Sequence, residues 1–238
     1  MIVPNTGMSA IVVKCVVDFM CPWTFIGLQS LQLAVKEYSS SNIQVQLLPF
    51  EFDEPGTYPP EGTDWTEYCN SYGPLKADFL LKEKLPRAFR LGEEIGISFD
   101  IKRRIVHTEN TNSGLMFVQE QNQSGLDFSL RMLHHHFEAL RDPNDQQLLT
   151  DVFTDLGIEG SVVKAFWKES DKAARNAAWT RQARMMGAPP VPKFNITCGE
   201  SEENLCDRVL GQPTSPDFFR RIFQLCHQIM ERTNTEEL

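Results

Sequence analysis

A short segment near the start of the chain has the residue types that thiol chemistry requires. Cys21 follows an apolar run at residues 10–18 and precedes Pro22, Trp23 and Thr24. The apolar run predicts a buried strand, and Pro22 favours the first turn of a helix because its missing N–H would be unpaired there anyway. Cys21 is therefore expected between a strand and a helix, where a thiol can act as a nucleophile.

The position of Cys21 predicts an activated thiol. The first turn of a helix has unpaired N–H groups and a partial positive charge, and both stabilise a thiolate. We therefore expect the pKa of Cys21 to lie well below the value of about 8.5 of a free cysteine. The hydroxyl of Thr24 is expected to donate a hydrogen bond to the sulfur. The alternative is a small buried hydrophobic residue, as most unpaired cysteines are, and the spacing alone leaves both open.

A proline-rich segment near the end of the chain is the second element of the candidate site. Residues 187–196 read GAPPVPKFNI, and Val191-Pro192 stands at the start of a predicted strand. A proline at that position is often a fixed turn and sometimes a cis bond. A proline-rich surface loop with a weak PxxP pattern is the alternative.

The periodicity of apolar residues predicts a mixed α/β chain. Its first part is a strand, a helix that starts at Pro22 and a second strand, which together form a parallel βαβ unit. A long helical block follows, and a β-β-α segment ends the chain, with Ser215-Pro216 at the start of the last helix. The expected strands are 10–18, 43–50, 191–198 and 203–210. The expected helices of the block are 64–72, 74–95 with a kink or new start at Pro86, 112–123, 126–140, 145–156, 160–168 and 170–186.

Composition and charge argue against several classes of protein. The chain of 238 residues is 41% hydrophobic and 23% charged, and the net charge of −9 disfavours nucleic acid or an anionic membrane as a partner. No apolar stretch approaches the roughly 18 residues that span a membrane. No signal peptide is seen, so a cytoplasmic, reducing location is expected.

The other cysteines are expected to be inert, unpaired thiols. They stand at positions 15, 69, 198, 206 and 226, without the spacing of a zinc site. Cys198 and Cys206 fall on neighbouring predicted strands, but no disulfide is expected between them. Three consecutive histidines, 134–136, point about 100° apart on a helix and cannot converge on one metal ion. A solvated surface is therefore predicted for them, and neither a metal site nor a tightly bound cofactor is expected.

These segments together resemble the DsbA-like branch of the thioredoxin superfamily, and within it the FrnE-like group of predicted dithiol-disulfide isomerases. The resemblance implies a thioredoxin-like fold (β-α-β … β-β-α) with a large all-helical insertion. Residues 10–62 and 187–233 would then be the two halves of the thioredoxin-like domain, and 63–186 the insertion. The segments that carry the resemblance follow the family's order: DFMCPWTFIG at 18–27, LPFEFDEP at 48–55, LGEEIGISF at 91–99, ENTNSGL at 109–115, RMMGAPPVPKF at 184–194 and VLGQP at 209–213.

The resemblance also implies roles for single residues. Cys21 corresponds to the nucleophilic cysteine, and Pro192 to a cis-proline that faces it. The backbone of Val191 is then expected to pair with the backbone of a peptide or glutathione ligand, as in strand addition. The other candidate site residues are Pro22, Trp23 and Thr24 in the motif, and Phe19, Asn110 and Gln212 in the pocket wall.

Two departures from the family pattern shape the expected function. Thr24 stands where the family has its second cysteine, and Gly114, Leu115 and Met116 replace an Ala-His-Arg stretch. Without a second cysteine, a mixed disulfide on Cys21 must be resolved by an external thiol. We therefore expect a monothiol oxidoreductase that exchanges with glutathione, another small thiol, or a disulfide-containing peptide or protein. The oligomeric state is left open, with a dimer as one option.

Two other functions stay open. One is a glutathione-dependent transferase or isomerase, similar to the kappa-class transferases and hydroxychromene-carboxylate isomerases, which place a serine at the helix start. Those relatives usually carry an Asp-Arg pair after the last strand's glycine, and GQP at 211–213 stands here instead, which favours thiol exchange. The other is a non-catalytic peptide-binding module on the same fold.

Overall fold

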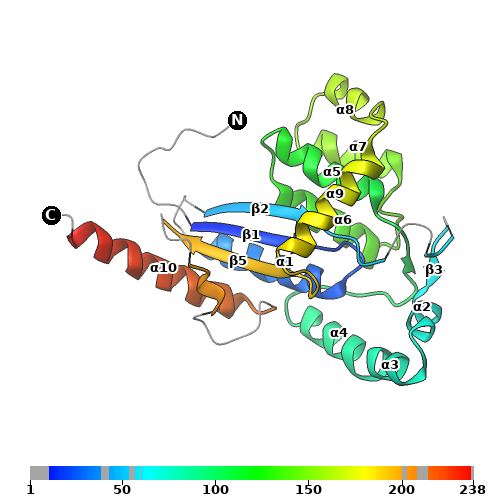
Figure 1. Cartoon of the computed structure of the whole chain (residues 1–238), viewed down its shortest axis with the longest axis horizontal. Helices are drawn as coiled ribbons and strands as arrows, with labels where there is room; N and C mark the ends of the chain where they lie inside the picture. Colours follow the sequence, from blue (N-terminus) through cyan, green and yellow to red (C-terminus); the bar gives the residue numbers. More distant parts are fainter. Residues whose placement is uncertain are drawn as a thin grey trace.

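A three-stranded sheet with the order β2-β1-β5 lies at the centre of the computed structural model (Figure 1). The structure describes residues 11–38, 43–53, 57–59, 61–199, 203–207 and 214–236. Strand β1 (Ile11–Val17) pairs in parallel with β2 (Ile43–Pro49) and antiparallel with β5 (Lys193–Cys198). The β-α-β unit and the final strand and helix predicted from the sequence are therefore present.

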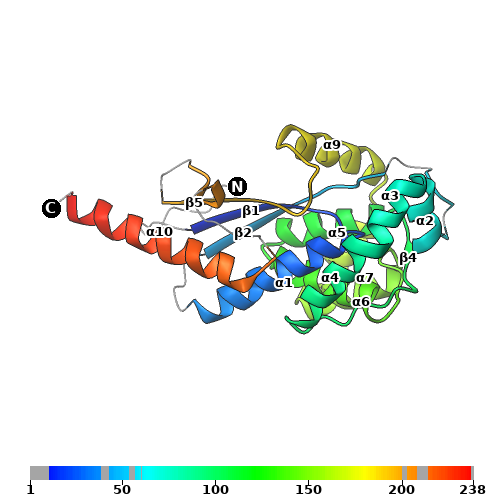
Figure 2. The same cartoon turned by 90° about the horizontal axis from the view of Figure 1, so that it is seen from below.

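Helices cover the sheet and form a block at one end of it. Helices α1 (Pro22–Glu37) and α10 (Pro216–Glu236) lie on one side of the sheet, and α9 (Lys172–Met185) lies on the other (Figure 2). The remaining elements are β3 (Thr63–Asp64), α2 (Trp65–Ser71), α3 (Pro74–Phe79), the π-helical turn η1 (Leu80–Lys84), α4 (Leu85–Glu93), β4 (Arg104–Ile105), α5 (Glu109–Glu120), α6 (Gly125–Phe137), α7 (Gln146–Asp155), α8 (Gly160–Trp167) and the 3₁₀ turn η2 (Leu205–Asp207).

The helices fall where the periodicity of the sequence placed them, within a few residues at each end. Of the kink or new helix start expected at Pro86, the structure shows the new start, because the π-helical turn η1 ends at Lys84 and α4 begins at Leu85 with Pro86 in its first turn. Pro86 has no N–H to donate to the carbonyl four residues earlier, so the regular α-helical ladder cannot continue through it.

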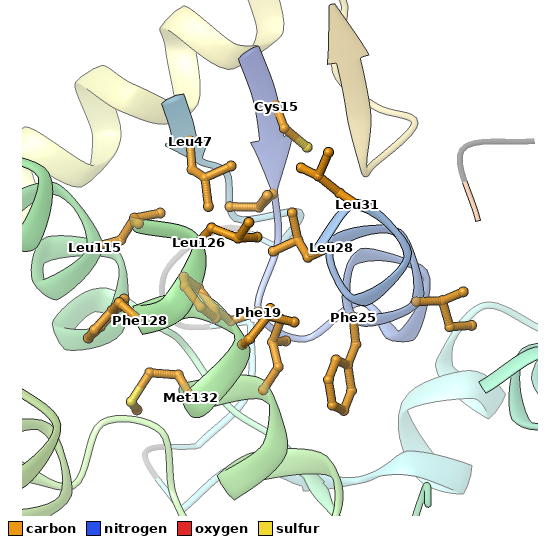
Figure 3. Close-up of a cluster of buried hydrophobic side chains, with 14 of the residues drawn as sticks. Cys15, Phe19, Phe25, Leu28, Leu31, Leu47, Leu115, Leu126, Phe128 and Met132 are labelled. Atoms are coloured by element: carbon orange, nitrogen blue, oxygen red, sulfur yellow. The ribbon is translucent and has the colours of Figure 1, made fainter. Parts of the chain in front are cut away.

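One hydrophobic core joins the sheet to the helical block. Phe19, Phe25 and Leu28, from the first strand-helix unit, are at most 1% exposed and pack with Phe128 and Met132 of α6 (Figure 3). The rings of Phe19 and Phe128 meet edge to face with centroids 6.3 Å apart. The same core contains residues from both sides of the predicted boundary at 63. The division into 10–62, 63–186 and 187–233 stays a prediction.

Two details of the predicted fold differ from the structure. The insertion contains a small antiparallel sheet, β3-β4, in addition to its helices. The predicted strand 203–210 is wrong over its described part, because Leu205–Asp207 forms the 3₁₀ turn η2 and 208–210 lies outside the described residues. Asn204 explains the turn: its Oδ1 accepts from the N–H of Ile196 in β5, 3.0 Å away, and from the N–H of Cys206, 3.2 Å away.

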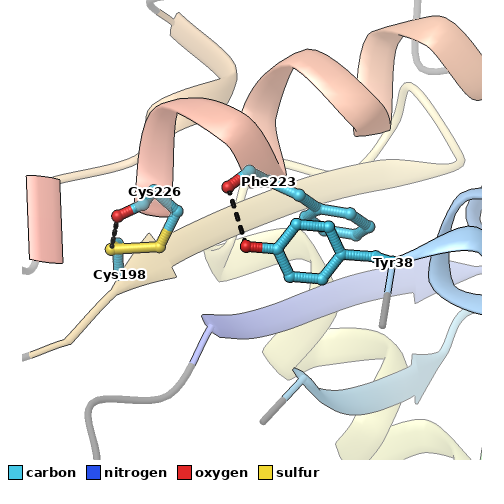
Figure 4. The surroundings of a disulfide bond; sticks show 4 residues. All are labelled: Tyr38, Cys198, Phe223 and Cys226. Atoms are coloured by element: carbon cyan, nitrogen blue, oxygen red, sulfur yellow. Dashed lines mark hydrogen bonds between the residues drawn. A yellow bond between two sulfur atoms is a disulfide. The ribbon is translucent and has the colours of Figure 1, made fainter. Parts of the chain in front are cut away.

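A disulfide between Cys198 and Cys226 joins β5 to α10, so the expectation that these two cysteines are unpaired thiols is wrong. Cys198 and Cys226 are bonded, with their Cα atoms 5.5 Å apart (Figure 4). Cys226 lies on the apolar face of α10 that packs against β5, so the two side chains meet in the core. Beside them, the hydroxyl of Tyr38 donates to the carbonyl of Phe223 over 3.4 Å (Figure 4).

His136 corrects the prediction of a solvated histidine surface. It is 3% exposed, whereas His134 and His135 are partly buried. Its Nε2 lies 3.5 Å from a guanidinium nitrogen of Arg103, another buried residue, which precedes β4. Burial, and then the charge of Arg103, lower the pKa of His136 to about 3, so the ring is neutral near pH 7.

Candidate active site

Three loops meet at one end of the sheet because of how the strands pair. Strands β1 and β2 are parallel, so their C-terminal ends lie side by side. Strand β5 is antiparallel to β1, and the pairing of Val16 with Lys193 brings the start of β5 to the same end. The segments 18–21, 50–53 and 187–192 are therefore neighbours, although they are far apart in the sequence.

Cys21 lies at the start of α1, opposite the loop that precedes β5. Its backbone is extended, with φ −89° and ψ 117°, and Pro22 follows as the first helical residue. Its thiol donates a weak hydrogen bond to the carbonyl of Val191, with Sγ 3.6 Å from the oxygen. The Val191-Pro192 bond is cis. The predicted cis bond at Val191-Pro192 is therefore confirmed. The Val191 carbonyl faces Cys21, whereas Pro192 itself does not line the cavity beside it.

The predicted activation of the Cys21 thiol is wrong. Burial, and to a smaller extent the negative charge of Asp18, raise the pKa of Cys21 to about 11. The N–H groups of Trp23 and Thr24 and the hydroxyl of Thr24 act in the opposite direction, as expected at the start of a helix. They do not outweigh burial, so Cys21 is a neutral thiol near pH 7.

Asp18 is the buried acidic group next to this thiol. It is 5% exposed, its Oδ1 accepts from the N–H of Met20 over 2.8 Å, and its own N–H donates to the Thr24 hydroxyl over 3.3 Å. Burial raises the pKa of Asp18 to about 7, and the charges of Glu51 and Asp53 act in the same direction. Near pH 7, Asp18 therefore carries a proton in roughly half of the molecules.

A cavity of about 340 Å³ opens beside Cys21. Three carboxyl groups line it, those of Asp18, Glu51 and Asp53. A cavity of this size, with apolar walls and a few polar groups, fits a small molecule or part of an extended peptide. The aromatic residues of its wall are Trp23, Phe52, Tyr58, Trp65, Tyr68 and Tyr72.

Hydrogen bonds fix the polar groups of the cavity. The hydroxyl of Tyr68 donates to Asp53 Oδ2 over 2.8 Å and lies 2.7 Å from the hydroxyl of Tyr72. His107 Nδ1 lies 2.6 Å from Glu51 Oε1. Burial raises the pKa of both tyrosines, so their hydroxyls keep their protons. No motif in the sequence pointed to these residues individually, although Glu51 and Asp53 belong to the segment 48–55 that carried the family resemblance.

The structure brings together part of the predicted site. Cys21, Pro22, Trp23 and Val191 line the cavity, and Thr24 is buried beside Cys21 with 1% exposure. The roles proposed for these residues stay predictions, because their position alone does not test them.

The predicted pocket wall is placed elsewhere. Phe19 is in the core, 1% exposed against Phe128, because it follows β1 on the side that packs on α6. Asn110 binds Asn144 instead: its backbone N–H donates to Asn144 Oδ1 over 3.1 Å, and its amide donates to the Asn144 carbonyl over 3.4 Å. Neither residue lines the cavity, and Gln212 lies outside the described residues.

Comparison with protein families agrees with this geometry. The family description of a DSBA-like thioredoxin domain matches residues 12–223. This chain therefore belongs to the family of DSBA-like thioredoxin domains, as the resemblance of its sequence to the DsbA/FrnE-like group indicated. No curated protein matches the chain.

Solved structures of low sequence identity share the fold. The probable DsbA oxidoreductase from Streptomyces coelicolor has a TM-score of 0.67 and 19% identity, over 92% of this chain and 90% of its own. The cytosolic disulfide reductase DsbM from Pseudomonas aeruginosa, solved with GSH, has a TM-score of 0.58 and 18% identity, over 91% and 99%. A 2-hydroxychromene-2-carboxylate isomerase has a TM-score of 0.51 and 15% identity, over 81% and 86%. At these identities the likeness establishes the thioredoxin-like fold.

Two further features concern the described part of the chain as a whole. No helix there is both long and apolar enough to cross a membrane. Among the same residues, no group of three or more histidine, cysteine and acidic side chains is arranged to hold a metal ion.

Proposed function

We propose that this protein is a thiol–disulfide oxidoreductase of the DsbA-like type that works with one active-site cysteine, Cys21. The observation that carries the proposal is the position of its Sγ, 3.6 Å from the Val191 carbonyl at the wall of a cavity of about 340 Å³. Among the described cysteines, Cys21 is the one that lines this cavity. A disulfide bound in the cavity would therefore meet this sulfur.

The exchange has two steps, and each conserves atoms and electrons. The Cys21 thiolate attacks one sulfur of a small disulfide, a mixed disulfide forms on Cys21, and the other half leaves as a thiolate that takes up a proton. A small thiol then attacks the mixed disulfide and releases Cys21. Thr24 cannot supply this second sulfur, so the resolving thiol comes from solution. Glutathione is one candidate, since the DsbM neighbour was solved with GSH.

Val191 offers a binding position for the main chain of a ligand. The ladder between β1 and β5 ends at Lys193, so Val191 lies outside the sheet pairing. In the proposal, the backbone of a peptide or of glutathione pairs with the backbone of Val191 and so brings its sulfur to Cys21.

The raised pKa of Cys21 sets the conditions for exchange. The thiolate is the nucleophile, and near pH 7 it is a small fraction of a thiol whose pKa is about 11. Exchange is therefore slow at neutral pH and accelerates as the pH rises. A bound ligand that offsets the negative charge around Asp18 would lower this pKa and speed the reaction.

Mass spectrometry of the intact protein after incubation with a small disulfide tests the proposal. We expect one adduct, located on Cys21 by peptide mapping and reversed by a small thiol. Cys21→Ser removes the adduct, and the control Cys206→Ser, which changes the other partly buried thiol, keeps it. An adduct on another cysteine, or none at pH 9 to 10 in the folded wild type, would refute the proposal.

One observation favours a second candidate, a glutathione-dependent transferase or isomerase. A thiol with a pKa of about 11 is a hydrogen-bond donor near pH 7, and it could hold the thiolate of bound glutathione without reacting itself. Cys21→Ser separates the two candidates. A serine hydroxyl would preserve glutathione-dependent turnover of an aromatic substrate, but it would abolish thiol exchange.

A further inference from the structure

The charges around the Cys21 cavity are unevenly distributed. Asp18, Glu51 and Asp53 place three carboxyl groups in its wall. Asp18 is buried, and Glu51 and Asp53 are partly buried. Charges in such positions are screened less by water and salt than charges on the surface. A ligand in the cavity is therefore exposed to their negative potential.

Few cations offset these carboxyl groups. In the described parts of the chain, no lysine or arginine forms an ion pair with Asp18, Glu51 or Asp53, and His107 is the partner of Glu51. Asp53 is held by the neutral hydroxyls of Tyr68 and Tyr72, over 2.8 and 3.5 Å. Hydrogen bonds from neutral donors hold a carboxylate in place without cancelling its charge.

The cationic groups near the cavity lie at its edge or behind its wall. Lys76 and Lys84 line the cavity but are exposed, with Lys76 Nζ 3.7 Å from the centroid of the Tyr72 ring. The buried guanidinium of Arg103 stacks on Trp65, 4.4 Å from a ring centroid, and does not line the cavity. The Cys21 sulfur is therefore acted on by the carboxyl group of Asp18 and, from behind the wall, by the buried charge of Arg103. Glu51 and Asp53 are the carboxyl groups of the cavity that have no lysine or arginine as an ion-pair partner among the described residues and no interaction with Arg103.

We propose that the cavity selects small disulfides that carry an amine near the sulfur, the aminothiol class, over disulfides that carry carboxylates. The proposal rests on the thiol exchange proposed for Cys21. In the first step, an R–S–S–R molecule with cationic R groups gives a Cys21–S–S–R bond and one aminothiol. A different small thiol, R′–SH, then attacks the mixed disulfide, regenerates Cys21 and leaves as R–S–S–R′. The net reaction is the exchange of R–S–S–R and R′–SH for R–S–S–R′ and the aminothiol, so no further oxidant or reductant is needed.

The walls of the cavity suit such a ligand in a second way. An ammonium group is attracted to the faces of aromatic rings, and Tyr58, Trp65 and Tyr68 present aromatic surface there. The carboxylate of Asp53, between two of the tyrosine hydroxyls, is a direct ion-pair partner for an amine. The same groups repel a carboxylate-bearing disulfide such as oxidised glutathione.

Three small disulfides of similar size and different charge test the proposal. They are cystamine, with two amines; 2-hydroxyethyl disulfide, which is neutral; and 3,3′-dithiodipropionate, with two carboxylates. Adduct formation on Cys21 is followed by intact mass, and each rate is divided by the rate of the same disulfide with a neutral cysteine derivative in free solution. This division removes differences in intrinsic reactivity. We expect the normalised rate to fall from cystamine to the neutral disulfide to dithiodipropionate, by about tenfold or more from first to last at low salt.

Matched variants assign the preference to the cavity. Asp53→Asn keeps the shape and an acceptor for the Tyr68 hydroxyl, and it should reduce the ratio of cystamine to dithiodipropionate rates several-fold. Asp155→Asn removes an exposed carboxylate on α7, which pairs with Arg131 away from the cavity, and should leave the ratio unchanged. Added salt at about 0.5 M should reduce the ratio in the wild type.

The outcomes separate this inference from the proposed function. Equal normalised rates, a preference for dithiodipropionate, or an unchanged ratio in Asp53→Asn would overturn the inference, while an adduct with the neutral disulfide would still support exchange at Cys21. No adduct with any of the three disulfides, at a pH where the free cysteine derivative reacts, would overturn both.

Discussion

The two sulfur sites of this molecule differ in what surrounds them. Cys21 is partly exposed at the wall of a cavity, where three loops meet at one end of the sheet. Cys198 and Cys226 are 2% and 0% exposed and are bonded to each other between β5 and α10. One site gives a thiol access to a ligand, and the other uses sulfur to join two elements of the core.

The comparison shows that the start of a helix does not by itself decide the state of a thiol. Cys21 has the helix N-terminus that favours a thiolate, yet burial and Asp18 raise its pKa to about 11. Cys198 and Cys226 have no such activation, and they are oxidised because a strand and a helix bring them together. Burial and close neighbours in space therefore determine the protonation and oxidation state of a thiol more strongly than the local sequence motif does.

The first prediction concerns the pH dependence of Cys21, with the largest expected effect. Because its pKa is about 11, its rate of alkylation should rise about tenfold per pH unit, or about a thousandfold between pH 7 and pH 10. Asp18→Asn removes a neighbouring negative charge and should increase the rate at pH 8. The measurement is alkylation by iodoacetamide, resolved by peptide mapping. A rate that levels off below pH 8 would mean that the thiol is activated after all.

The second prediction uses the stability of Asp18→Asn. The folded protein keeps a proton on Asp18 up to about pH 7, whereas the unfolded chain loses it near the ordinary value of 3.8. The unfolded state thus binds fewer protons between these values, so this contribution to stability is fully present below 3.8 and is lost as the pH rises through 7. The variant should be more stable than the wild type by up to about 4 kcal/mol at pH 8, and similar to it below pH 4.

Urea unfolding at several pH values measures this difference. Asp155→Asn is the control, because its carboxyl group is exposed and pairs with Arg131 at the surface. A gain in the stability of the wild type over Asp18→Asn as the pH rises from 5 to 8 would contradict the sign of the prediction.

The third prediction separates the two sulfur sites. Cys226→Ala removes the disulfide, which closes a loop with a sequence separation of 28, and should lower the free energy of unfolding by about 3.5 kcal/mol on the chain-entropy estimate. Under native conditions the rate of adduct formation at Cys21 should stay within about twofold, since the disulfide lies at the other end of β5 from the cavity. Chemical unfolding and intact mass give the two readings. A parallel loss of both would show that the sites are coupled through the sheet.

The fourth prediction has the smallest expected effect and turns Cys21 into a dithiol site. Thr24 is three residues after Cys21 on the first helical turn, so the two side chains share a face, and Thr24→Cys should allow a disulfide between positions 21 and 24. We expect protein-disulfide reductase activity with dithiothreitol as donor to rise about tenfold, and Cys21→Ser in the same background to remove the gain. A folded variant without the gain would mean that the cavity excludes protein disulfides and admits only small ones.

Much of this molecule could be predicted from its sequence. The apolar runs and proline positions predicted β1, α1, β2, β5 and α10 because these elements depend on side-chain periodicity and on the local effect of proline. The resemblance added the family and the cis bond at Val191-Pro192. The predicted strand at 203–210 is wrong over its described residues, where Leu205–Asp207 forms a 3₁₀ turn and the Asn204 side chain accepts from the N–H groups of Ile196 and Cys206.

The tertiary structure alone decided the chemical state of the site and the pairing of the sulfurs. The sequence shows Asp18 three residues before Cys21, but only the packed structure shows that Asp18 is buried, that Cys21 is partly buried, and that the charge of Asp18 raises the pKa of Cys21. His136 is neutral for the same reason, because Arg103 and the core enclose it. Cys198 finds Cys226 because α10 packs on β5. Secondary structure follows from neighbours along the chain, whereas a pKa or a disulfide depends on which distant groups the fold brings within a few ångströms and how much water it leaves between them.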